Sequence, residues 1–179
     1  MKLARIGERG SEVPAVLDRD GVHRDVSSLV SDFTPEFFAG DGTERLRSSD
    51  LSALPAVEGR IGAPIARPSL ILCVGLNYVD HANESSMKVP EEPILFTKAP
   101  NCLVGPYDEV LTPRGATTVD YEVELAVVIG RQCRYLESPE QAMKHLAGFT
   151  IANDVSERTF QLLRGGGQWI KGKSCETFN

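Results

Sequence analysis

Features that the sequence lacks exclude several kinds of protein. The chain of 179 residues has four cysteines, but none of them are paired at the C-x-x-C spacing of a zinc or redox motif. They predict reduced thiols in a cytoplasmic protein rather than a disulfide framework. Lys and Arg number 19 against 25 Asp and Glu, so the net charge is −6. Because basic surfaces bind nucleic acids and anionic membranes, neither is an expected partner.

Long apolar stretches are also missing. The longest apolar run, Leu70–Leu76, is far shorter than a membrane-spanning helix requires. The opening residues MKLARIGERGSE carry charge but no apolar segment of the kind found in a signal peptide. Since 41% of the residues are hydrophobic, the chain can still form a packed core. We therefore expect a soluble, cytoplasmic protein.

The first part of the chain predicts a small α+β domain. Apolar runs flank Asp20-Gly21, a dipeptide suited to a tight hairpin turn. Thr34-Pro35-Glu36 is typical of the start of a short helix, and a second short helix fits around Glu44–Leu51. The stretch Leu54–Pro68 is rich in proline and glycine, which is typical of a linker. We place a boundary there, which gives domains 1–68 and 69–179.

The rest of the chain predicts short strands and few helices. The expected strands are Leu70–Leu76 (buried), Pro93–Lys98, Cys102–Gly105, Tyr121–Gly130 and Phe149–Asp154. Ser138-Pro139-Glu140-Gln141 predicts a helix start, and Gly148 is its expected end. A short helix is also expected at Ser156–Leu163. Many short strands with few helices favour a β-rich α+β fold.

Two acids alternate along one of these strands. Side chains at positions i and i+2 of a strand share a face, so Glu122 and Glu124 point the same way. Val123, Leu125 and Val127 are then expected to face the core. Two neighbouring carboxylates repel each other unless water or a cation separates them. The pattern predicts either a solvent-facing strand or a cation site.

A third acid and a lysine follow later in the chain. Asp154 ends the predicted strand after FTIAN, and Lys173 is expected in a glycine-lined loop. Three carboxylates without histidine or cysteine match the oxygen preference of Mg²⁺, Mn²⁺ or Ca²⁺, not of zinc. The alternative for Asp154 is an ordinary turn or helix-capping aspartate.

His81 and Glu84 form an H-x-x-E pair in NYVDHANES. On one helical turn the two side chains can meet, and a carboxylate that polarises an imidazole makes a general base near neutral pH. The alternative is a surface histidine with an incidental acid nearby.

The segment Gly167–Ser174 matches the P-loop pattern G-x-x-x-x-G-K-[ST]. A P-loop follows a buried strand and opens a helix, whereas the residues before this segment look helical and then glycine-rich. Trp169 and Ile170 are also bulky for a loop that wraps phosphates. Nucleotide is therefore not an expected ligand.

Taken together and in order, these motifs resemble the fumarylacetoacetate hydrolase family. The resemblance covers about Leu70 to Phe178, and its segments are CVGLNYVDHANE, PILFTKAPNCLVGP, VDYEVELAVVIG, GFTIANDVSERTFQ and KGKSCETF. It implies the family's mixed β-sheet roll, preceded by a small N-terminal α+β domain, in a homodimer. It also implies Mg²⁺ (or Mn²⁺ or Ca²⁺) held by Glu122, Glu124 and Asp154.

The resemblance implies roles for five further residues. Lys173 matches the family's active-site lysine. His81 and Glu84 match a general-base pair, and Arg158 and Gln161 match positions that bind substrate oxygens. Family members continue beyond the point that matches Asn179, with more sheet and a late Gly-Thr-Pro-type loop, so part of the sheet and of the site is expected to be missing.

The implied reaction is metal-dependent cleavage of a C–C bond in an acylpyruvate or β-diketo acid of the fumarylacetoacetate type. One alternative is isomerisation or decarboxylation of a 2-hydroxyhepta-2,4-diene-1,7-dioate-like or oxaloacetate-like 2-oxo acid. Another is a non-catalytic, metal-binding domain that needs a partner polypeptide.

Overall fold

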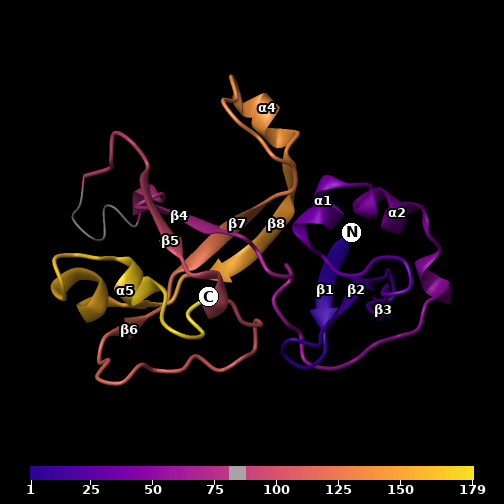
Figure 1. Ribbon diagram of the computed structural model, residues 1–179, viewed down its shortest axis with the longest axis horizontal. Coiled ribbons are helices and arrows are strands. Elements are labelled where there is room, and N and C mark those ends of the chain that lie inside the picture. Colours follow the sequence, from indigo (N-terminus) through magenta and orange to yellow (C-terminus); the bar gives the residue numbers. More distant parts are fainter. Residues whose placement is uncertain (81–87) are drawn as a thin grey trace. The chain divides into compact units, whose positions relative to one another are not determined.

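The computed structural model describes residues 1–80 and 88–179 (Figure 1). By its internal contacts the chain forms two compact units. Unit 1 comprises Met1–Pro68, Val104–Glu109 and Val123–Ala152. Unit 2 comprises Ser69–Leu103, Val110–Glu122 and Asn153–Asn179. Short helices accompany several small sheets, so the α+β fold class is confirmed. The division into domains 1–68 and 69–179 stays a prediction.

A three-stranded antiparallel sheet opens unit 1. Its strands, in sheet order, are β1 (Lys2–Ile6), β2 (Val13–Leu17) and β3 (His23–Asp25). Between β2 and β3, the Asp18 carboxylate accepts hydrogen bonds from the backbone N–H groups of Asp20 and Val22. Gly21 has a φ of +80°, a conformation that glycine adopts without strain. The predicted hairpin is confirmed.

Two short helices follow this sheet. Helix α1 (Pro35–Ala39) begins as predicted, with the Thr34 hydroxyl accepting a hydrogen bond from Phe37 N–H. Helix α2 (Gly42–Ser48) begins earlier than expected and ends earlier too, because a separate 3₁₀ turn forms at Leu51–Ala53. The Asp50 side chain caps that turn by accepting from Ser52 N–H, which breaks the helix there.

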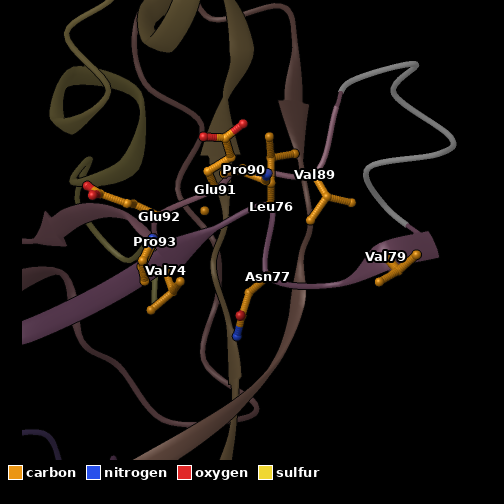
Figure 2. A pocket seen from close by; sticks show the side chains of 10 residues that line it. Val74, Leu76, Asn77, Val79, Val89, Pro90, Glu91, Glu92 and Pro93 are labelled. Atoms are coloured by element: carbon orange, nitrogen blue, oxygen red, sulfur yellow. The ribbon is translucent and has the colours of Figure 1, made fainter.

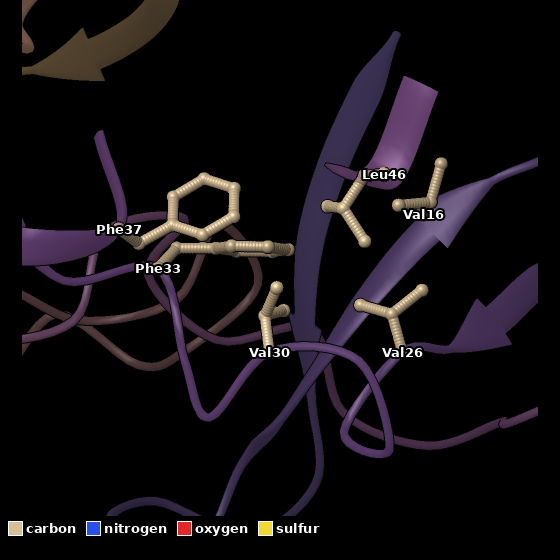
Figure 3. Close-up of a cluster of buried hydrophobic side chains, with 6 residues drawn as sticks. All are labelled: Val16, Val26, Val30, Phe33, Phe37 and Leu46. Atoms are coloured by element: carbon tan, nitrogen blue, oxygen red, sulfur yellow. The ribbon is translucent and has the colours of Figure 1, made fainter. Parts of the chain in front are cut away.

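The apolar core of unit 1 lies between the sheet and the helices (Figure 3). Its buried members are Val16, Val26, Val30, Phe33, Phe37 and Leu46. The rings of Phe33 and Phe37 pack in a tilted arrangement with centroids 5.0 Å apart. This cluster gives the N-terminal part of the chain a closed hydrophobic interior.

The predicted linker is packed against the first sheet. It forms no helix or strand, but Ile61 pairs with Ile6 in an isolated bridge. Arg60 forms ion pairs with Glu12 and Asp108, and Asp108 belongs to the short segment that also packs in unit 1. A Cβ atom at Gly105 would collide with the backbone oxygen of Ile61, so glycine is required at this close approach.

The other part of unit 1 is the hairpin of β7 (Val123–Ile129) and β8 (Leu146–Asn153), with α4 (Pro139–Met143) at its tip (Figure 1). Ser138 caps α4 as predicted, accepting from Gln141 N–H. The predicted helix end at Gly148 is wrong. Helix α4 ends at Met143 and β8 already begins at Leu146, because residues 146–153 pair with β7 instead of extending the helix.

The hairpin reverses the burial that its sequence predicts. Residues alternate between two faces, as expected, and Glu122 and Glu124 lie on the half-buried side. The apolar residues predicted to face the core are instead exposed: Val123 (69%), Leu125 (62%) and Val127 (46%). Neighbouring β8 also exposes its apolar residues Phe149 and Ile151. The prediction of a buried Val123–Val127 face is therefore wrong.

Unit 2 contains two two-stranded antiparallel sheets. They pair β4 (Ile71–Gly75) with β5 (Ile94–Lys98), and β6 (Val119–Asp120) with β9 (Ser156–Glu157). The prediction that the first of these strands is buried is wrong, since Leu72 and Val74 are exposed.

Three further predictions in unit 2 need correction. No strand forms at Cys102–Gly105, because Pro100 begins a 3₁₀ turn, Pro100–Cys102, instead. The expected helix at Ser156–Leu163 starts with the two residues of β9 and becomes a π-helix at Thr159–Leu163. Lys173 ends α5 (Ile170–Lys173) and so does not lie in a loop.

Two expected properties of the whole chain can be compared with the structure. All four cysteines are free, as predicted. Within the described ranges, no helix is long and apolar enough to cross a membrane.

Candidate active site

A buried aspartate, Asp154, is the centre of an ionic cluster in unit 2. It follows β8 directly, and its backbone N–H donates to the carbonyl of Glu122 at 2.8 Å. Only 3% of the residue is exposed. Lys98 Nζ donates to Oδ1 at 2.5 Å, and Lys173 Nζ donates to Oδ2 at 2.8 Å. Each oxygen of this carboxylate therefore has its own ammonium partner.

Lys173 joins this aspartate to a second carboxylate. Its Nζ also donates to Glu122 Oε2 at 2.6 Å and lies 5.0 Å from the ring centroid of Phe96. Close packing of α5 brings it there, because a Cβ atom at Gly172 would collide with the backbone oxygen of Glu157. The glycine of the G-K-S motif thus has a packing role, and the lysine after it reaches both carboxylates.

Arg158 closes the cluster on its more exposed side. It donates to Glu122 Oε1 at 2.6 Å, to Asp120 Oδ2 at 2.8 Å and to Gln161 Oε1 at 3.1 Å. The guanidinium lowers the pKa of Asp120, chiefly through this hydrogen bond. Burial alone would lower the pKa of Arg158, but its bonds to the two carboxylates outweigh that effect and raise it. Both partners are therefore firmly ionised near neutral pH.

The cluster contains matched charges. Its cations are Lys98, Arg158 and Lys173, and its anions are Asp120, Glu122 and Asp154. Burying such groups is costly unless each is paired, and here each one is. The exposed side-chain fraction rises from 0% at Lys98 to 18% at Glu122 and 49% at Asp120. A ligand can therefore approach the cluster from the side of Glu122 and Asp120.

Two of the three predicted metal ligands meet at one cationic centre. Glu122 Oε2 and Asp154 Oδ2 both contact Lys173 Nζ, so an ammonium lies where carboxylate oxygens converge. Oxygen donors of this kind fit Mg²⁺, Mn²⁺ or Ca²⁺. Across the residues described, no group of three or more His, Cys, Asp or Glu side chains is arranged to hold a metal ion.

Four other residues were predicted for the site: Glu124, Gln161, His81 and Glu84. Glu124 belongs to β7 in unit 1, whereas the cluster belongs to unit 2. Gln161 is buried (4% exposed) and in contact with Arg158. His81 and Glu84 lie outside the described residues.

Sequence reasoning missed two residues of this region. Lys98 ends β5 and is in phase with Phe96, so a lysine that continues the alternation of an apolar strand was the available signal. Glu157 is fully buried and accepts hydrogen bonds from the Thr118 hydroxyl and from the backbone N–H groups of Thr117, Thr118 and Phe160. No pattern in the sequence separates it from a surface acid.

A separate cavity of about 190 Å³ lies beside β4 and the start of β5 (Figure 2). Its lining is mainly apolar and consists of Val74, Gly75, Leu76, Asn77, Val79, Val89, Pro90, Glu91, Glu92 and Pro93. Of the described site residues, none lines it. Among the described residues that line this cavity, no cation contacts a carboxylate, so we take the ionic cluster as the candidate active site.

Comparison with known proteins gives a consistent result. The family model for the fumarylacetoacetate hydrolase C-terminal domain matches residues 70–179. A 2,4-didehydro-3-deoxy-L-rhamnonate hydrolase from Sphingomonas is 46% identical over 99% of this chain and 61% of its own length. The chain spans 61–63% of the length of the curated relatives that match it over nearly all its residues.

Solved structures agree with this result. The fumarylacetoacetate hydrolase of Exiguobacterium antarcticum is 31% identical with a TM-score of 0.75. The match covers 99% of this chain and 63% of that protein. The 5-carboxymethyl-2-hydroxymuconate delta-isomerase of Mycobacterium smegmatis is 30% identical with a TM-score of 0.73 and the same coverage. The relatives are thus hydrolases and isomerases with the same fold. The chain belongs to the fumarylacetoacetate hydrolase family.

Proposed function

We propose that the protein is a divalent-metal-dependent hydrolase that cleaves a carbon–carbon bond in an acylpyruvate or related β-diketo acid. The observation that carries this proposal is the convergence of Glu122 and Asp154 on Lys173 Nζ in a largely buried site. Enclosed carboxylates around one cationic centre are costly for stability and suited to binding a charged ligand.

The name of the Sphingomonas relative supports this substrate class. It describes a sugar acid oxidised at carbons 2 and 4, on either side of a deoxygenated carbon 3. Two carbonyl groups separated by one carbon, next to a carboxylate, define an acylpyruvate. We infer that this protein acts on the same arrangement of groups.

The reaction adds water across a carbon–carbon bond. Water attacks the acyl carbonyl carbon, and the bond from that carbon to the pyruvate CH₂ group breaks. The electron pair of the broken bond remains on the pyruvate part as an enolate, which takes up a proton. The products are pyruvate and a carboxylic acid, so no oxidant or further reactant is needed.

The cluster residues would stabilise the charge that develops. Lys173 and Arg158 place an ammonium and a guanidinium on the same carboxylate, Glu122, from two sides. Fixed cations in a shielded site stabilise an enolate oxygen more strongly than water does. A divalent cation held by Glu122, Glu124 and Asp154 would supply Lewis-acid polarisation of the substrate carbonyl.

Two further roles complete the proposal. His81, oriented by Glu84, would take the proton from the attacking water as a general base. Arg158 and Gln161, which already contact each other, would hold substrate oxygens. A bidentate guanidinium suits a carboxylate group of the substrate.

Turnover of an acylpyruvate with Mg²⁺ tests this function. We expect pyruvate release that stops on chelation and returns when Mg²⁺ is restored. Glu124→Ala should abolish most of it, whereas Glu109→Ala, a change at an exposed glutamate, should leave it intact. Normal turnover in Glu124→Ala, or in the presence of a chelator, would refute metal-dependent hydrolysis.

Isomerisation or decarboxylation of a related 2-oxo acid is the second candidate. The delta-isomerase of Mycobacterium smegmatis, at 30% identity, favours it. Reaction in H₂¹⁸O separates the two, because only hydrolysis places solvent oxygen in the new carboxylate. Unlabelled products formed at full rate would assign an isomerase or decarboxylase.

We further propose that the protein acts as a homodimer in the cytoplasm. Analytical ultracentrifugation of the purified protein, alone and mixed with a full-length relative, tests the assembly. A dimer of identical chains supports the proposal. A monomer that associates only with a different polypeptide would favour the alternative of a domain that needs a partner.

A further inference from the structure

Lys98 is the most completely enclosed charged group of the ionic cluster. It ends β5, and none of its side chain is exposed. Its Nζ donates to Asp154 Oδ1 at 2.5 Å and to the carbonyl of Val155 at 3.1 Å. An apolar side chain of similar volume is often as stable or more stable in such a position than a buried ion pair. Stability therefore does not account for a lysine here.

The two lysines of the cluster hold Asp154 in different ways. Both partners of Lys98 come from one short stretch, Asp154 and Val155, so Lys98 fixes the carboxylate together with the backbone behind it. Lys173 divides its contacts between Asp154 and Glu122, and Glu122 is partly exposed. Lys98 thus lies on the fully enclosed side of the carboxylate, and Lys173, itself 2% exposed, lies on the side of the partly exposed Glu122.

Backbone contacts hold this arrangement in register. Ala99 N–H, next to Lys98, donates to the Ser174 hydroxyl at 2.9 Å, which ties the end of β5 to the end of α5. Asp154 N–H is bonded to the carbonyl of Glu122 at 2.8 Å. The two lysines are therefore set at a fixed spacing on opposite oxygens of one carboxylate.

We propose that Lys98 is a positioning residue that holds Asp154 by Oδ1, so that Oδ2 stays directed at the point that it shares with Glu122, where Lys173 Nζ now lies and a cation would bind. It acts through Asp154 and touches no reacting atom. This inference rests on the proposed metal-dependent function in one respect. The proposed cation is the ligand toward which Lys98 would keep Asp154 Oδ2 oriented.

Two roles for Lys98 predict opposite changes in cation affinity. If the lysine acted only as a positive charge, its removal would strengthen binding of a cation to the carboxylates. If it orients Asp154, its removal weakens binding, since loss of a partner that holds a metal ligand typically costs about 10–100-fold in metal affinity. The sign of the change separates the roles.

The test measures Mn²⁺ binding to the purified protein by electron paramagnetic resonance of the free ion. We expect the Kd for Mn²⁺ to rise at least about tenfold in Lys98→Met, and to recover in part in Lys98→Gln, which keeps a donor toward Asp154. Lys144→Met, a change at an exposed lysine, is the matched control and should leave the Kd unchanged. Unchanged or tighter binding in Lys98→Met overturns the proposal.

A second measurement separates this inference from the proposed function. Denaturant unfolding without metal, for Lys98→Met, Asp154→Asn and the double variant, should show that the two substitutions are coupled. Coupling in a wild-type protein that binds no Mn²⁺ would refute the metal site while leaving the orientation of Asp154 by Lys98 in place. Independent effects of the two substitutions, or failure of both Lys98 variants to fold, would overturn the positioning role.

Discussion

Phe33 and Lys98 are both fully enclosed, but in opposite surroundings. Phe33 lies in the apolar cluster of residues 1–68, whose buried members are all hydrophobic. Lys98 lies in the later part of the chain, whose described buried side chains include Asp154, Ser156, Glu157, Gln161, Lys173 and Thr177. Phe178 and Val155 are buried there too, but many large apolar residues of this part are exposed, among them Leu72, Leu95, Leu125 and Phe149.

The difference shows what burial does in each part of the chain. Enclosing Phe33 removes apolar surface from water and stabilises the fold directly. Enclosing Lys98 and Asp154 opposes stability unless the pair is well made, and it keeps two charges in fixed positions. Burial in the first region thus favours stability, whereas the second region holds the site for which we propose ligand chemistry. Substitutions in the two regions should affect different measured quantities.

Removal of an aromatic ring from the apolar core should have the largest effect. Phe33→Ala should lower the free energy of unfolding by about 4 kcal/mol, because it deletes a buried ring and leaves a cavity. Urea unfolding measures the loss. Activity per folded molecule should not change. Phe149→Ala, at a 58% exposed ring on β8, is the control and should cost less than about 1 kcal/mol. Equal losses at both positions would mean that the exposed hairpin face is covered in solution.

Removal of the shared ammonium should give the complementary result. Lys173→Ala should lower kcat by about 10²–10³-fold, the usual cost of losing one group that stabilises developing charge. Its effect on unfolding should be smaller, since Asp154 keeps Lys98 and Glu122 keeps Arg158 as partners. Steady-state turnover with an acylpyruvate and Mg²⁺ measures kcat.

The neighbouring lysine provides the control for that prediction. Lys171 is exposed and lies two residues before Lys173 on the same short helix, α5. Lys171→Ala should leave kcat within about twofold of wild type, since surface substitutions rarely perturb a site. A kcat that survives Lys173→Ala would contradict the functional meaning given to the buried charges.

The sequence predicts local structure better than it predicts which residues are buried. Caps at Thr34 and Ser138 and the turn at Asp20-Gly21 depend on residues close together in the chain, and all three are confirmed. The hairpin face at Val123–Val127 was predicted to be buried and is not. Alternation along a strand identifies two faces but does not say which one is covered, because that depends on distant segments.

The candidate site shows the same limit. The sequence singled out Glu122, Asp154 and Lys173 by their unusual positions, and the family resemblance added Arg158. The structure brings these four residues together. Lys98 was missed because a lysine at the end of a strand looks like a solvated end. Its phase with Phe96 was a weak signal, and the pairing of β5 with β4 and the contact of Lys98 with Asp154 show its burial.

Glu157 is a buried carboxylate held by hydrogen bonds, so its substitution tests how much such bonds stabilise a buried charge. Burial raises the pKa of its carboxyl, but hydrogen bonds from Thr118 and from backbone N–H groups outweigh that effect, and the pKa is lowered. Glu157→Gln places an NH₂ group against these donors and should cost about 2 kcal/mol at pH 7. Urea unfolding should show the loss, whereas Glu58→Gln, at an exposed position, should change little.

The pH dependence of that loss follows from the sign of the shift. A carboxyl whose pKa is lowered in the folded state contributes stability above its unfolded pKa and loses it as the pH falls through the folded value. The difference between wild type and Glu157→Gln should therefore narrow below about pH 4. A difference that stayed constant down to pH 3 would mean that hydrogen bonding geometry, not ionisation, holds this position.

The smallest expected effect concerns two helix caps with the same geometry in the two parts of the chain. Thr34 and Ser138 each accept a hydrogen bond from a backbone N–H at 3.4 Å, but α1 buries Phe37 in the apolar core and α4 buries nothing. Thr34→Ala should lower the free energy of global unfolding by about 1 kcal/mol. Ser138→Ala should leave it unchanged and only speed amide hydrogen exchange within α4, because an exposed helix frays without unfolding the rest. Equal effects on global unfolding would show that α4 is packed against other protein surface in solution.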